Sequence, residues 1–419
     1  MKKIIGFAAL IIIVAIIIGS IGSCSVCSNE THRSWFNEDG TAKIDTTLTS
    51  ADTFNIEIPS SVHFFMEASG SMNGFLRGGV PTDFKTDVWE IINYYSNAVS
   101  AVSVLSSDGG NTQSIDLSVG QFQNPFNGGG FVSGKSTNLR QMIESITNNI
   151  HPEKNEVAVF ISDMEYDPVG SVAPSVLASV FATDIAAIFS KFGYSASLVA
   201  AMSNSIDKQG NLQTATRPYY YLILGKAECV SSVRNCISIM LNENKHFLDN
   251  IETGFKYGNV HYKIVDYSGC TQIGSDPSFA KISDAGCSFV LGVKLENYRW
   301  LLTTDSEKLK ESFHIESKNG AKIAVDSISY EIHNTINKQL QRDVLAKIHI
   351  SVTQMPFDCD VLSWNISVPS TDTSKLQMLF TDTPNSINQT FSIKEFITGM
   401  FRASLVNNDG KENFIHIAK

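Results

Sequence analysis

The chain has 419 residues, 43% of them hydrophobic, and a formal net charge of -10 at pH 7. This length and composition predict two or three domains with sizeable apolar cores. The acidic balance and the lack of clustered lysines and arginines argue against a general nucleic-acid-binding protein, because binding to phosphates needs such clusters.

The first 24 residues are predicted to be a targeting or anchoring segment that lies outside the fold. Two lysines precede a nearly unbroken apolar run over residues 4–18, and small residues then lead to Cys24. The segment resembles either a bacterial secretory signal that ends in a lipobox (Ile-Gly-Ser-Cys) or an uncleaved helix long enough to cross a bilayer. Both interpretations anchor the chain to a membrane with its bulk outside the cytoplasm, and we favour a lipoprotein at Cys24. The polar residues 25–55 are predicted to be a tether.

From about residue 60 the chain alternates strand and helix patterns, which predicts an α/β domain over residues 60–245. Apolar runs predict strands at residues 62–66, 99–105, 157–161, 194–202 and 219–224, and alternation predicts a hairpin strand at 114–122. Apolar residues spaced by three and four predict helices at residues 84–95, 139–150, 174–192 and 228–241. The predicted fold class is α/β, a doubly wound, mostly parallel sheet of Rossmann-like type with helices on both faces.

Residues 250–419 have a different character and are predicted to form a smaller, β-rich, sandwich-like domain. Strand-like runs cover residues 260–267, 288–295, 321–332, 345–352 and 361–368. Near the end of the chain, apolar residues recur on one face of a predicted helix at residues 393–405. We expect this carboxyl-terminal helix to pack on the β-rich domain.

Oxygen-bearing side chains gather in three segments that a parallel sheet would bring to one edge. Glu67, Ser69 and Ser71 follow the first predicted strand, Thr137 precedes a helix, and Asp163 ends the strand at 157–161. Carboxylate and hydroxyl oxygens are hard ligands that suit Mg²⁺, Mn²⁺ or Ca²⁺ better than zinc. The pattern therefore predicts a metal site made of these five residues.

This arrangement resembles the von Willebrand factor A-type (vWA) domain and its metal-ion-dependent adhesion site. That family carries Asp-x-Ser-x-Ser after the first strand, a threonine in a later loop and an aspartate after the fourth strand. Ser69, Ser71, Thr137 and Asp163 match these positions, whereas Glu67 stands where the family has aspartate. The resemblance implies a bound cation with one open coordination position, which an acidic side chain of a protein partner fills. Such a site binds a partner and catalyses nothing, so no enzyme is expected.

Two alternatives remain open at the level of sequence. Residues Gly129–Ser136 satisfy the P-loop pattern G-x-x-x-x-G-K-S, which would indicate a nucleotide-binding enzyme. Against this, no apolar strand directly precedes Gly129, and ATP is scarce outside the cytoplasm. The second alternative is a structural vWA module whose metal site is empty, because Glu67 replaces the shorter acid.

Overall fold

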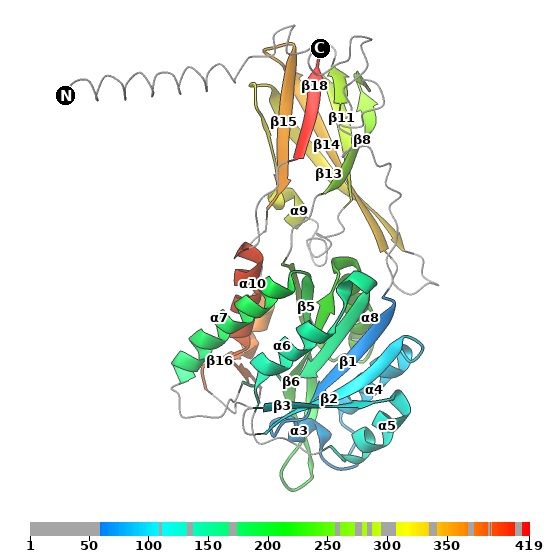
Figure 1. Ribbon diagram of the computed structural model, residues 1–419, viewed down its shortest axis with the longest axis vertical. Coiled ribbons are helices and arrows are strands. Elements are labelled where there is room, and N and C mark those ends of the chain that lie inside the picture. Colours follow the sequence, from blue (N-terminus) through cyan, green and yellow to red (C-terminus); the bar gives the residue numbers. More distant parts are fainter. Residues whose placement is uncertain are drawn as a thin grey trace, which may run out of the picture.

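The structure is a computed structural model. It describes residues 59–419 apart from residues 109–110, 132–136, 167–173, 256–259, 273–278, 283–286, 295–306, 335–341, 368–372, 384–385, 387 and 407–412. The predicted anchor and tether lie outside the described residues. Figure 1 shows a seven-stranded sheet with its helices at one end of the molecule and two β-rich sheets at the other.

The seven-stranded sheet is mixed and has the strand order β3-β2-β1-β4-β6-β5-β7. At its centre, β1 pairs in parallel with β2 on one side and with β4 on the other, and every other neighbouring pair is antiparallel. The strands are β1 (Ser61–Glu67), β2 (Val99–Asp108), β3 (Asn111–Leu117), β4 (Glu156–Ser162), β5 (Ser195–Ile206), β6 (Leu212–Gly225) and β7 (Phe247–Gly254).

The prediction of an α/β fold is confirmed, but the prediction of a mostly parallel sheet is wrong. A tight turn joins β5 to β6, where the carboxylate of Asp207 accepts hydrogen bonds from the backbone N–H groups of Gln209 and Asn211. A connection this short can only return antiparallel, because a parallel return needs a crossover of roughly a dozen residues or more. Strand β6 therefore runs back between β4 and β5, and β7 adds a further antiparallel edge.

Helices cover both faces of this sheet, as their apolar stripes predict. One core lies under α6, α7 and α10, and the other lies under α3, α4, α5 and α8. These helices are α3 (Asn73–Leu76), α4 (Asp83–Tyr94), α5 (Val119–Gly128), α6 (Leu139–Asn149), α7 (Pro174–Phe192), α8 (Ala227–Glu243) and α10 (Ile393–Val406). Helix α5 takes the end of the segment predicted as a strand at 114–122, because Ser118 and Gln121 form a capping box that starts a helix.

The predicted β-rich character of the later residues is confirmed. One sheet has the order β12-β15-β18-β10-β9 and the other β13-β14-β11-β8, and side chains of both sheets share one apolar core. Their strands are β8 (His261–Ser268), β9 (Cys270–Gln272), β10 (Phe279–Ile282), β11 (Cys287–Lys294), β12 (Phe313–Ser317), β13 (Lys322–Asn334), β14 (Arg342–Gln354), β15 (Cys359–Ile366) and β18 (Asn413–Ala418).

Helix α10 lies elsewhere than we expected from its place in the chain. Its buried residues Phe396, Ile397 and Met400 belong to the core of the seven-stranded sheet, and the helix packs along α7 (Figure 1). The chain thus leaves the β-rich sheets, returns to the α/β part and then supplies β18 to the β-rich part. Among the described residues, no helix is long and apolar enough to cross a membrane.

Candidate metal-binding site

Two apolar strands carry the acidic residues of the candidate site to one edge of the sheet. Strands β1 and β4 are parallel neighbours whose register ends with Met66 opposite Ile161. Both residues are fully buried, so the hydrophobic effect fixes the strands and leaves the polar residues that follow at the sheet edge. Glu67 at the end of β1 and Asp163 just after β4 therefore come together.

Glu67 is the most deeply buried acid of this cluster and has no exposed surface. The hydroxyl of Thr137 donates a hydrogen bond to Glu67 Oε1 at 3.1 Å, and the hydroxyl of Ser162 donates to Oε2. Thr137 reaches this position because it stands just before α6, where Asn138 caps the helix by accepting a hydrogen bond from the backbone N–H of Gln141. The two oxygens of Glu67 thus join two separate segments of the chain.

Asp163 is also buried and joins the cluster through Ser71. Its Oδ1 accepts hydrogen bonds from the Ser71 hydroxyl at 3.1 Å and from the backbone N–H of Glu165 at 3.2 Å. The Ser71 hydroxyl oxygen also lies 2.8 Å from that of Ser69, which is fully buried. All five residues predicted from the sequence therefore meet in one connected group.

The electrostatics of the group favour a bound positive charge. Burial, followed by the charge of Asp163, raises the pKa of Glu67 to about 8, although the hydroxyls of Ser162, Ser69 and Thr137 oppose the rise. Burial also raises the pKa of Asp163, against the effect of the nearby Arg217 guanidinium. Ionising two carboxyls that are buried side by side costs free energy, unless a cation compensates their charges.

The donor set fits a hard divalent cation. Asp163 is 4% exposed, and its Oδ2 has no hydrogen-bond partner among the described residues. A buried carboxylate oxygen without a partner is costly and fits a position where a water or an ion is taken up. Together with three hydroxyl oxygens and Glu67 it forms an all-oxygen set of the kind that Mg²⁺ or Mn²⁺ uses along with water. Within the described residues, no three His, Cys, Asp or Glu side chains converge as potential metal ligands, and this site too has only two acids, so hydroxyl oxygens would have to complete its donor set.

Other residues support the site, and local sequence patterns carry little or no signal for them. The Ser162 side chain accepts a hydrogen bond from the Met164 backbone at 2.7 Å in addition to donating to Glu67, whereas adjacency to Asp163 was its only sequence signal. The Thr390 hydroxyl lies 3.4 Å from the Asp163 carbonyl oxygen, and the Phe391 N–H donates to Glu165 Oε2 at 3.0 Å. These contacts join residues more than 220 positions apart in the sequence, so no local sequence pattern could predict them.

Most of the nucleotide-binding motif cannot be compared with the structure. Residues 132–136, which include Lys135, lie outside the described residues. The element before the motif is helix α5 and not a buried strand. Gly129 ends this helix in a left-handed conformation at φ 74°, where a Cβ would come within 2.2 Å of the Gly78 backbone nitrogen. The first glycine of the motif therefore has a local structural role as a helix terminator.

Comparisons of the chain with models of protein families, with curated proteins and with solved structures yield no match.

Proposed function

We propose that this chain is a membrane-anchored, extracytoplasmic binding protein whose vWA-like domain holds a divalent cation and captures an acidic side chain of a protein partner. The observation that carries the proposal is the buried Oδ2 of Asp163, which lacks a partner within the described residues and belongs to a cluster with Ser69, Ser71 and Thr137. The parallel strands β1, β2 and β4, with the hairpin strand β3, support the vWA-like interpretation.

Each residue has a distinct role in this proposal. Ser69, Ser71 and Thr137 supply neutral oxygens, and Asp163 supplies the charge next to the cation. Glu67 holds the hydroxyls of Thr137 and Ser162 in place and adds a second negative charge. A cation held by these residues would supply Lewis acidity to a carboxylate of the partner.

Isothermal titration calorimetry with Mg²⁺ and with Mn²⁺ tests the proposal. The wild type should bind, and Thr137→Ala should bind at least about tenfold more weakly, because it removes a ligand and leaves Glu67 Oε1 without its donor. Thr183→Ala is the matched control, since that threonine is exposed on α7 and bonds only to its own helix. Absence of heat in the wild type would favour an empty structural module, and equal binding in all three proteins would refute the assigned site.

The nucleotide-binding alternative is tested separately. Thermal stabilisation by ATP or GTP that disappears in Lys135→Ala would favour a P-loop enzyme over the proposed adhesion-type site.

A further inference from the structure

A groove of about 780 Å³ begins at the candidate metal site and runs outward along the β5–β6 turn. Ser71 forms part of its wall, so the groove and the metal site share a residue. Its other walls come from the loop and helix that follow β1, from Glu165 and from the hairpin of β5 and β6. Figure 1 shows this hairpin projecting beside α3 at the end of the molecule away from the β-rich sheets.

Strand β6 contributes Gln213, Ala215 and Arg217 to the lining of the groove. The pairing of β6 with β5 shifts register between Gln213 and Arg217, so β6 is irregular where it lines the groove. Its volume of about 780 Å³ lies in the range of sites that hold a ligand larger than one side chain. The groove therefore has the volume for a segment of chain, not only for a single side chain.

Arg217 is held at the inner end of these three residues. Its guanidinium lies over the Phe75 ring, with Cζ 5.6 Å from the ring centroid. Its Nη1 also lies 2.7 Å from the point where a Cβ would stand on Gly74, so the guanidinium packs directly over this glycine. The guanidinium is close enough to Asp163 to oppose the rise in the pKa of that residue. A fixed cation thus stands beside the metal site.

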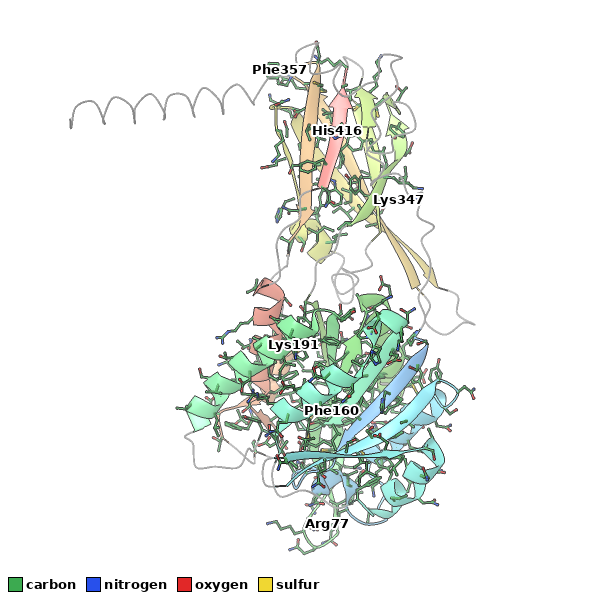
Figure 2. All side chains as sticks on the ribbon, in the orientation of Figure 1. Arg77, Phe160, Lys191, Lys347, Phe357 and His416 are labelled. Carbon is green, nitrogen blue, oxygen red and sulfur yellow. The ribbon has the colours of Figure 1, made fainter. Side chains whose placement is uncertain are left out.

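The balance of free charge in the groove is positive. Arg77, Lys208 and Arg217 line it, and Arg77 Nη1 donates to the Lys208 carbonyl oxygen at 2.9 Å, which fixes the turn against α3 (Figure 2). Within the described residues, neither Lys208 nor Arg217 has a carboxylate as an ion-pair partner. The two acidic residues of the lining, Asp207 and Glu165, accept hydrogen bonds from backbone N–H groups and keep their charges, so three cations face two carboxylates and one net positive charge remains.

We propose that this groove receives an extended acidic peptide segment of the partner, and that Arg217 and Lys208 pair with its carboxylates. The cation of the proposed function would ligate one carboxylate of this segment at the Ser71 end, and that part of the inference rests on the proposed function. Arg217 is suited to the role because its planar guanidinium binds a carboxylate through two parallel hydrogen bonds. The arrangement makes recognition depend on several acidic residues in a row.

Fluorescence anisotropy with a fluorescein-labelled decaglutamate peptide and the full chain in detergent, at constant ionic strength, tests the inference. In the presence of Mg²⁺ the wild type should bind decaglutamate and should not bind decaglutamine. Arg217→Gln should weaken binding about tenfold, which corresponds to about 1.4 kcal/mol. Lys208→Gln should weaken it by a smaller factor, and because Lys208 is exposed on a turn this variant should not disturb folding. Lys191→Gln, on α7 outside the groove, is the charge-matched control (Figure 2).

The outcomes separate this inference from the proposed function. If decaglutamate does not bind, or binds equally to the wild type, Arg217→Gln and Lys208→Gln, the groove is not an acidic-peptide site, whatever calorimetry shows for Mg²⁺. If binding depends on Arg217 but is unchanged in EDTA, the groove proposal stands and the cation-dependent function fails. Displacement of the peptide by an equal charge concentration of inorganic phosphate would identify the groove as a phosphate site and overturn the peptide.

Discussion

Glu67 is the residue on which the interpretation of the site depends. Its side chain accepts hydrogen bonds from two hydroxyls on different segments, Thr137 before α6 and Ser162 at the end of β4. The carboxyl is fully buried near Asp163, and its pKa is about 8. At neutral pH without a cation, Glu67 is therefore mostly protonated, and a divalent cation would have to displace that proton.

This raised pKa predicts how stability depends on pH. The folded state holds a proton on Glu67 up to about pH 8, whereas the unfolded state releases it near the ordinary value of 4.5. The contribution is fully present below pH 4.5 and is lost as pH rises to about 8, with a slope of about 1.4 kcal/mol per pH unit in between. Urea unfolding in EDTA at a series of pH values should show this loss.

The variant Glu67→Gln, which keeps an acceptor oxygen and cannot ionise, should flatten that slope. Mg²⁺ should stabilise the wild type more at pH 8 than at pH 6, because less work is needed to remove the proton. A wild-type slope that matches the slope of the variant would show that Glu67 does not hold the proton.

At the scale of elements, the contact between α10 and α7 ties the end of the chain to the α/β part. Gly399 faces α7 at very close range: a Cβ at this position would lie 2.7 Å from the Ala182 carbonyl oxygen and 2.8 Å from Ile185 Cβ. Glycine ordinarily weakens a helix interior by about 1 kcal/mol relative to alanine. Here its small size permits the two helices to approach, and Thr390 and Phe391 just before α10 then contact the loop of Asp163.

The change Gly399→Ala should therefore destabilise the protein, although the higher helix propensity of alanine alone would predict stabilisation. The added methyl group meets backbone as well as side-chain atoms, so overpacking should lower the free energy of unfolding by about 1–3 kcal/mol. Lys394→Ala, an exposed position on the same helix, should change it by less than about 0.5 kcal/mol. Urea denaturation compares the two, and a more stable Gly399→Ala protein would show that the helices are not in close contact.

At the scale of the whole molecule, the proposed binding surface and the β-rich sheets lie at opposite ends. Figure 1 shows α3 and the β5–β6 turn at one end and the two β-rich sheets at the other. A partner that approaches the metal site and the groove would therefore contact the α/β end without touching the β-rich sheets. The proposed anchor in residues 1–24 lies outside the described residues, and its chemistry is open to a direct test.

If Cys24 carries a lipid, Cys24→Ala should change both processing and location. Blocking lipidation should leave an unprocessed precursor and abolish incorporation of labelled fatty acid, because only a thiol can accept the diacylglycerol group. Cys27→Ala is the matched control, since it removes a neighbouring thiol outside the lipobox. Absence of labelling from the wild type would favour an uncleaved transmembrane helix, and labelling that persists in Cys24→Ala would place the lipid on another residue.

The sequence predicted most of the elements and the composition of the site. Apolar runs such as Val157–Ile161 and the stripes of α4 and α6 carry enough periodic burial to define strands and helices without tertiary information. Elements with competing local signals were harder to predict. Over residues 114–122, the alternation of apolar residues predicted a strand, whereas the capping box at Ser118 starts a helix. The direction of β6 was not predicted either, because apolar runs identify strands but do not tell whether neighbouring strands pair parallel or antiparallel.

What the sequence determined by itself is the set of oxygen-bearing side chains that meet: Glu67, Ser69, Ser71, Thr137 and Asp163 each stand next to an apolar element. Burial of that element carries them to the sheet edge. Tertiary structure alone decided what surrounds them. The insertion of β6 next to β4 places Arg217 beside Asp163, and the return of α10 brings Thr390 to the same loop. Such neighbours depend on strand order and on contacts across more than 200 residues, which local patterns of hydrophobicity do not encode.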